Sequence, residues 1–260
     1  FDTTAPEIEA QLIPAGRVDG IVSGVGSSGT LTGIGNYFKQ RAAAGKHKPV
    51  KMILADPAGS ILAPLVNEGK TIEPGSWLLE GMGEDFVPDI CDLSLVSEGI
   101  TVTDGESFFA ARELLAKEGV LAGSRSGGIL AAALKWARKQ PRPAASGKPL
   151  NIVTFICDSG AKYLSKMFND FWMMDNGFIQ RQKTNDLRDL IARRHDLGED
   201  YTLRETHPVR QAIKWMQLYG VSQMAVLDEA GGGGGIFDEG DIPIGLATHP
   251  SAFYRPVSGF

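Results

Sequence analysis

Hydrophobic and polar residues form alternating blocks over the first two thirds of the chain. Short apolar runs predict buried strands at residues 19–25, 50–55 and 151–157. Stretches of helical character between and after them predict helices at residues 29–44, 103–119, 128–139 and 161–174. Strands interleaved with helices favour an α/β fold, in which an open, mostly parallel sheet is flanked by helices.

The pattern changes after Phe178. Residues 179–200 are rich in charged side chains and have no extended apolar run, which predicts a charged linker. The remaining residues, 201–260, include a predicted helix at 209–219, a predicted strand at 223–227 and five consecutive glycines at 231–235. We expect the glycines to form a flexible loop and neither a helix nor a strand. The predicted organisation is a larger domain (1–178), a linker (179–200) and a small module (201–260).

Composition narrows the class of protein. A chain of 260 residues with 43% hydrophobic and 22% charged residues is typical of a folded globular protein. Its apolar runs are far shorter than the roughly 20 residues that cross a bilayer, so we expect no membrane partner. A net charge of -5 disfavours nucleic acid as a partner. Cys91 and Cys157 form no CxxC pair, so we expect neither a disulfide framework nor a metal site, and a reducing cytoplasmic location.

One glycine-rich segment is the first candidate for binding chemistry. Residues 24–30 (Gly-Val-Gly-Ser-Ser-Gly-Thr) lie between a predicted strand and a predicted helix, where glycines allow close backbone approach and the first helical N–H groups lack partners. This segment, called the phosphate loop below, suits a small phosphate ester. It lacks the GxxxxGK[ST] pattern of nucleotide-triphosphate loops. It matches GxGxxG only formally, so a dinucleotide site and a purely structural turn are open alternatives at this point.

Two further segments rich in Gly and Ser occupy comparable places. Residues 123–128 form a predicted turn that opens a helix, and residues 157–160 follow a predicted strand. Open α/β sheets bind ligands outside the carboxyl ends of their strands. We therefore expect the three segments to contribute to one ligand site.

Several longer motifs point to one family. They are GVGSSGTLTG at 24–33, DPAGS at 56–60, EGMGEDFVP at 80–88, EGVLAGSRSGG at 118–128 and CDSGAKYLSKMFNDFWMMDNGF at 157–178. In this order they resemble the fold type II pyridoxal-phosphate enzymes of the cystathionine β-synthase and cysteine synthase family, over essentially all of residues 1–178. Residues 221–229 and 235–242 resemble one cystathionine-β-synthase-type (CBS) regulatory motif, which implies a partial CBS module of α+β type at 201–260.

The resemblance implies a set of cofactor-binding residues. For pyridoxal 5'-phosphate these are Gly26, Ser27, Ser28, Gly29 and Thr30 at the phosphate, Ser124, Arg125 and Ser126 at the pyridine nitrogen, and Asp158 near the pyridine edge. Gly81, Met82 and Gly83 are implied as a loop that faces the substrate, with Glu84 where some relatives have Tyr. Ser28 stands where the family usually has Gly, which is expected to lower phosphate affinity.

Arg125 is the most notable departure, because the resemblance implies a Ser hydroxyl at the pyridine nitrogen. A guanidinium cannot accept a proton, so Arg125 can only donate to a neutral nitrogen or point away, in which case a neighbouring Ser makes the contact. Asp158 and Ser159 also have two possible roles, a water-mediated contact at the pyridine or the cap of the next helix. Cys157 is expected to be a buried small residue, and the aromatic and Met residues of 167–174 a core or dimer face.

The family's Schiff-base Lys lies in a motif before the phosphate loop, and no such motif occurs in this sequence. We therefore expect the chain to correspond to an enzyme without its N-terminal part, with no catalytic residue of its own and no activity alone. The implied reaction is β-replacement of L-serine by L-homocysteine, giving L-cystathionine and water. Alternatives are cysteine synthesis from O-acetylserine and sulfide, and a noncatalytic module that binds a cofactor phosphate or adenosyl nucleotide. Expected partners are amino-acid substrates, further copies in a homo-oligomer and an adenosyl ligand at the CBS module.

Overall fold

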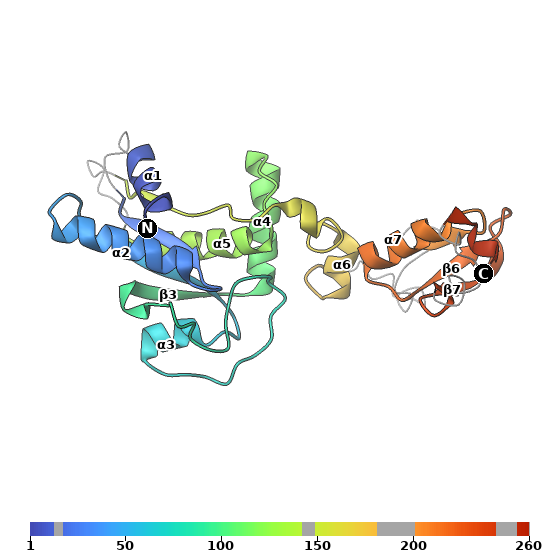
Figure 1. Ribbon diagram of the computed structural model, residues 1–260, viewed down its shortest axis with the longest axis horizontal. Helices are drawn as coiled ribbons and strands as arrows, with labels where there is room; N and C mark the ends of the chain where they lie inside the picture. The colour runs from blue at the N-terminus through green and yellow to red at the C-terminus, as the bar shows by residue number, and fades with distance from the viewer. Residues whose placement is uncertain (13–17, 142–148, 181–200, 243–253, 260) are drawn as a thin grey trace. The chain divides into compact units, whose positions relative to one another are not determined.

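A computed structural model describes residues 1–12, 18–141, 149–180, 201–242 and 254–259. The chain divides into two compact units, residues 1–168 and residues 169–260 (Figure 1). The predicted linker at 179–200 lies almost entirely outside the described residues. The predicted domain boundaries therefore remain predictions, and each unit is described by itself.

The first unit is built on a four-stranded sheet. Its strands are β1 (Gly20–Gly24), β2 (Lys51–Pro57), β3 (Val96–Val102) and β4 (Ile152–Val153), in the order β3-β2-β1-β4. All three pairings are parallel, which confirms the predicted α/β class. The strand predicted at 151–157 is too long, since β4 ends at Val153. The backbone N–H of Cys157 instead donates to the Ser126 hydroxyl, so the chain after β4 turns toward the second Gly/Ser segment.

Helices cover both faces of this sheet. They are α1 (Thr4–Gln11), α2 (Gly29–Ala43), α3 (Leu62–Glu68), α4 (Asp104–Glu118) and α5 (Ser124–Lys139), with a short 3-10 turn η2 (Leu93–Leu95) before β3. α1 and α2 lie side by side (Figure 1). The sequence patterns did not predict α1, α3 or β3. They did predict α4, which begins with a capping box between Thr103 and Glu106.

Alternate residues of the strands enter two different cores. Ile21 and Leu54 pack with α1, α2 and α3 on one face, whereas Val22 and Ile53 pack with α5 on the other. This arrangement explains why the strands appear in the sequence as continuous apolar runs, because both faces of each strand are buried. It also fixes the carboxyl ends of β1 and β2 beside the starts of α2 and α5.

The outer edge of β3 is covered by side chains. Asn67 donates from Nδ2 to the Gly99 carbonyl and accepts from the Gly99 N–H, both at 2.8 Å. Lys135 Nζ donates to the Thr101 carbonyl at 2.9 Å. Backbone groups that would otherwise be free to pair with another strand are thus satisfied at two positions.

Residues 160–175 differ from the single helix predicted there. They form a 3-10 turn η3 (Gly160–Tyr163) and, after a break, the short helix α6 (Asp170–Asp175). Asn169 causes the second start, because its side chain accepts hydrogen bonds from the N–H groups of Phe171 and Trp172. Met167 and Met173 are buried as expected for a core, and the predicted dimer face is not tested by a single chain.

The second unit contains α6 and a three-stranded mixed sheet. β5 (Thr202–Arg204) runs parallel to β6 (Gln223–Leu227), and β7 (Gly233–Asp238) runs antiparallel to β6; α7 (Val209–Tyr219) packs on this sheet, and a 3-10 turn η7 (Val257–Gly259) follows. Leu203, Met224 and Phe237 are among its buried residues. The expectation of a loop over residues 231–235 is wrong for 233–235, because pairing with β6 supplies the hydrogen bonds that order these glycines.

Within the described residues, no helix has both the length and the apolar character needed to cross a membrane. No group of three or more His, Cys, Asp or Glu side chains that could hold a metal ion occurs in the same part of the chain.

Candidate functional site

The phosphate loop joins β1 to α2 and presents the start of that helix to solvent. Ser27, Gly29 and Thr30 are exposed, and no side chain among the described residues caps α2. Ser28 is buried with φ of 73°, a left-handed conformation that costs a non-glycine residue about 1–2 kcal/mol. Its hydroxyl lies 3.0 Å from that of Thr32, inside the base of the helix. The open N–H groups and the positive end of the helix dipole suit an anion such as a phosphate.

The loop at Gly81–Gly83 lies directly against the phosphate loop. The Gly83 N–H donates to the Val25 carbonyl at 2.9 Å. Gly81 and Gly83 have φ of 73° and 94°, so both need the conformational freedom of glycine. A Cβ at Gly26 would meet the Gly81 carbonyl oxygen at 3.3 Å. The two segments that the resemblance assigns to phosphate and substrate are therefore neighbours in space.

The third segment opens α5, and Asp158 caps that helix. Asp158 Oδ1 accepts from the N–H of Ser126 at 3.0 Å and from its hydroxyl at 2.5 Å, and Oδ2 accepts from the N–H of Arg125 at 3.3 Å. The helix consequently begins at Ser124, and the turn predicted over 123–128 is wrong except at Gly123. Ser159, not Asp158, caps the 3-10 turn that follows it. Asp158 thus stabilises an earlier helix through a long-range contact.

Arg125 reaches from the start of α5 to the loop at Gly81. A Cβ at Gly81 would meet Nη2 of Arg125 at 1.7 Å and Nε at 2.9 Å, so the guanidinium occupies the space that only glycine leaves free. Nε is buried and has no hydrogen-bond partner among the described residues. A buried donor without an acceptor is unfavourable, typically by about 1–3 kcal/mol. The arrangement therefore provides a cation with an unused donor next to the phosphate loop.

Two carboxyl groups lie near these loops: Asp56, which the sequence analysis missed, and Glu84, which it noted beside the substrate-side loop. Asp56 is a buried residue near the carboxyl end of β2, and burial is the main cause that raises its pKa from 3.8 to about 6. Burial also raises the pKa of Glu84, and the nearby Asp85 adds to this effect. A Cβ at Gly26 would lie 3.9 Å from Glu84 Oε1. The signal for Asp56 was present, because an acidic residue directly after a buried strand lies at the ligand-binding edge of such a sheet.

The structure thus brings the predicted cofactor-binding segments together at the carboxyl edge of the sheet. Lys39 and Lys162 are exposed and lie outside the three loops. Cys157 is exposed, so the expectation of a buried residue is wrong: the chain leaves the sheet at Val153, before Cys157 can enter the core. The open helix start and the orphaned Arg125 Nε fit a ligand with a phosphate and a further hydrogen-bond acceptor, as pyridoxal phosphate has.

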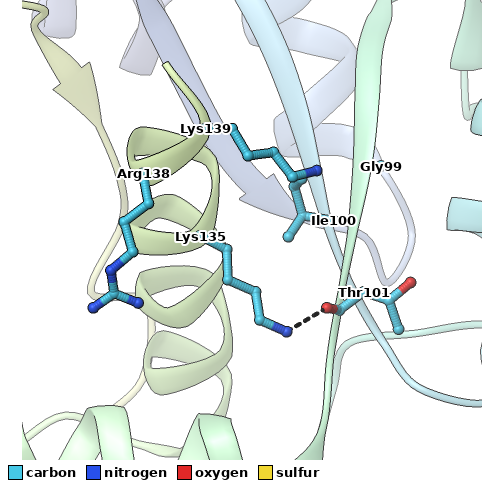
Figure 2. Close-up of a pocket in the computed structure, with 6 residues that line it drawn as sticks. All are labelled: Gly99, Ile100, Thr101, Lys135, Arg138 and Lys139. Atoms are coloured by element: carbon cyan, nitrogen blue, oxygen red, sulfur yellow. Dashed lines mark hydrogen bonds between the residues drawn. The ribbon is translucent and has the colours of Figure 1, made fainter. Parts of the chain in front are cut away.

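A separate cavity of about 420 Å³ lies between β3 and α5. Figure 2 shows Lys135 and Lys139 reaching from the helix toward the strand, while Arg138 extends away from it. Lys135 pairs with Glu106, and Lys139 pairs with Glu98. These pairs neutralise the two lysines, and basic residues in the last turn of a helix also match its dipole. The ion pairs and the helix dipole therefore account for the basic side chains that line the cavity. None of the residues that line it belongs to the three loops.

A family model described as "Pyridoxal-phosphate dependent enzyme" matches residues 1–158. The chain is 34% identical over 238 residues to a cystathionine β-synthase of Dictyostelium discoideum, covering 88% of this chain and 45% of the relative. It is 37% identical over 177 residues to a cysteine synthase of Buchnera aphidicola, covering 68% of this chain and 52% of the relative. A solved O-acetylserine dependent cystathionine β-synthase from Helicobacter pylori matches with a TM-score of 0.51 and 33% identity, covering 64% of this chain and 47% of that one. The chain spans about half the length of these proteins.

Proposed function

The chain belongs to the family of pyridoxal-phosphate dependent enzymes, and from this membership we propose that the protein catalyses a β-replacement on an amino acid. The proposed reaction condenses L-serine with L-homocysteine to give L-cystathionine and water, as a step of cysteine biosynthesis. The cofactor of the family is pyridoxal 5'-phosphate. When bound, it supplies an electron sink for loss of the α-proton and of the group at the β-carbon.

One observation favours this reaction over cysteine synthesis from O-acetylserine and sulfide. The match to the cystathionine β-synthase covers 88% of the chain and has to include most of the unit at 169–260, whereas the match to the cysteine synthase covers 68% and can be accommodated largely within the first unit. The similarity to cystathionine β-synthase continues through the second unit and therefore supports the reaction of that enzyme.

The chain's own residues have defined tasks under this proposal. The N–H groups at the start of α2, with the hydroxyls of Ser27 and Thr30, bind the cofactor phosphate. Gly81 and Gly83 keep the substrate-side loop free of side chains, so that the ring and substrate can approach the backbone. Met82 is buried beneath this loop and holds it against β1. Under this proposal these residues bind and orient the ligands.

The test is turnover by the complete gene product loaded with pyridoxal phosphate. L-serine or O-acetylserine is combined with homocysteine or with sulfide, and the products are identified by mass spectrometry. The proposal expects cystathionine from L-serine and homocysteine as the preferred reaction. Cysteine as the main product from O-acetylserine and sulfide would favour the alternative. Cofactor binding without turnover of any pair would indicate a noncatalytic module.

We further propose that residues 201–260 form a partial CBS-type regulatory module, and that the protein is a homo-oligomer, a dimer or larger. The mixed sheet β5-β6-β7 with α7 is compatible with such a module, which would bind an adenosyl ligand. Ending the complete protein at Phe178 should leave turnover in place and change its assembly or its response to adenosyl ligands. Loss of all activity in a folded truncated protein would show that this division is wrong.

A further inference from the structure

The three residues that open α5 differ in what they leave free for a ligand. Ser126 is fully buried, and its hydroxyl donates to Asp158 and accepts from the N–H of Cys157 at 2.9 Å. Ser124 is 1% exposed; its hydroxyl lies 3.4 Å from the N–H of Glu80, which donates to it, and also bonds to the Tyr163 side chain. Both serines are therefore committed to the fold. Arg125 is the one side chain of the three with a buried donor that has no partner among the described residues.

A separate observation indicates that a ligand supplies a hydrogen-bond acceptor to Arg125. Its Nε is buried without an acceptor among the described residues, and Nη2 is pressed against Gly81. Gly81 also borders the phosphate loop, through its carbonyl oxygen near Gly26. The start of α2 and the guanidinium lie on either side of Gly81. A ligand that binds α2 through its phosphate would therefore satisfy the guanidinium if it carried a second hydrogen-bond acceptor.

The following step rests on the proposed function, in which that ligand is pyridoxal phosphate. Besides the phosphate, its ring carries a phenolic oxygen beside the reacting carbon and a nitrogen on the opposite side of the ring. The reacting carbon needs open space for an amino acid and a lysine. The start of α5, where Ser124 and Ser126 are buried, leaves no room for an amino acid and a lysine. The side of the ring that faces α5 is therefore the side with the nitrogen, opposite the reacting carbon. We propose that Arg125 donates a hydrogen bond to the ring nitrogen and keeps that nitrogen unprotonated.

The charges around Arg125 agree with this assignment. A guanidinium has only donors and cannot accept a proton from a pyridinium. The start of α5 adds a positive dipole end. Among the nearby acids, both oxygens of Asp158 accept hydrogen bonds from α5, and Glu80 pairs with Lys166. Burial is the main cause that raises the pKa of Glu84, which weakens its tendency to carry a negative charge.

The consequence concerns the type of reaction. A protonated ring nitrogen makes the cofactor a strong electron sink, which suits transamination, whereas an unprotonated one is a weaker sink that favours elimination and replacement at the β-carbon. Arg125 would enforce this state with a permanent positive charge. A Ser hydroxyl in contact with the nitrogen is excluded here by the hydrogen bonds that Ser124 and Ser126 already make.

The experiment uses the complete protein loaded with cofactor labelled with nitrogen-15 in the ring. The chemical shift of that nitrogen, compared with model pyridine and pyridinium compounds, reports its protonation from mildly acidic to mildly alkaline pH. The wild type should show the unprotonated shift throughout. Arg125→Glu, which supplies an acceptor, should move the signal to the pyridinium position, and Arg125→Met should allow it to titrate. Arg138→Glu is the matched control on the exposed face of α5 and should behave as wild type.

A protonated nitrogen in the wild type would overturn the inference without any variant, even if neither substituted protein retains cofactor. So would an unchanged shift in both Arg125 variants. Failure of the proposed function looks different: the protein would then not bind pyridoxal phosphate, or would bind it without β-replacement. Turnover by a protein whose ring nitrogen is protonated would refute the role of Arg125 alone.

Discussion

Asp56 should make the stability of this protein depend on pH in a direction unusual for an aspartate. Its side chain is 1% exposed; Oδ2 accepts from the Ala63 N–H at 2.7 Å, and Oδ1 has no partner among the described residues. Burial is the largest cause that raises its pKa from 3.8 to about 6, hydrogen bonds from Ala63 and Ser60 oppose the increase, and the charge of Glu84 adds to it. The folded state therefore binds this proton more tightly than the unfolded state does.

The sign and size of the effect follow from this difference. Between pH 3.8 and about 6 the folded protein retains a proton that the unfolded chain has lost, so the free energy of unfolding falls as the pH rises. A pKa change of this size corresponds to about 3 kcal/mol once both states are ionised. Asp56→Asn is neutral at every pH and removes the dependence. Relative to wild type, the variant should gain about 2 kcal/mol between pH 3.8 and about 6, and about 3 kcal/mol between a pH well below and a pH well above this range.

Urea unfolding followed by circular dichroism at a series of pH values measures this difference. Asp92→Asn is the control, because Asp92 should change the stability with pH in the opposite direction. The hydrogen bond from the Ser94 hydroxyl is the main cause that lowers the pKa of the half-buried Asp92, so its carboxylate stabilises the folded state above its unfolded pKa and loses this effect as the pH falls. A difference between Asp56→Asn and wild type that stays constant with pH would refute the reasoning.

Three further predictions concern the loop and the lysines. Ser28→Gly should be about 1 kcal/mol more stable than Ser28→Ala in urea unfolding, because both lose the same hydrogen bond and only glycine relieves the left-handed strain; equal stabilities would contradict that strain. Replacing Ser27 and Thr30 with Ala in the complete protein should weaken cofactor binding by about 1–3 kcal/mol, and an unchanged affinity in a fluorescence titration would remove the loop from the site. Borohydride reduction of the present chain with pyridoxal phosphate should label no single lysine stoichiometrically, and a specific adduct on Lys39 or Lys162 in peptide mapping would show that the Schiff-base residue is already here.

Much of the first unit could be predicted because its signals are local. The runs that become β1 and β2 are apolar on both faces, and the Thr103–Glu106 capping box marks the start of α4. Within the second unit, α7 and β6 have the predicted bounds. The phosphate loop was identifiable because a glycine-rich turn between a strand and a helix has a distinctive sequence.

The errors occur where a distant partner decides the local structure. Asp158 caps α5 from more than thirty residues away, which starts the helix inside a segment that looks like a turn. Pairing with β6 orders glycines at 233–235 that would otherwise be flexible. The same limit applies to the site. The sequence left two roles open for Arg125, and the contacts of Ser124 and Ser126, which support the role that we propose for it, join residues far apart in the sequence.

The covered edge of β3 bears on how this protein behaves when it is concentrated or newly made. Because Asn67 and Lys135 occupy outward backbone groups of that strand, a strand from another molecule would first have to displace both side chains before it could pair there. This edge is thereby protected from the strand addition that seeds β-rich aggregates. Removing the amide of Asn67 would leave backbone groups of β3 free to pair with a strand of another molecule. Such a variant should therefore lose solubility before it loses ligand binding.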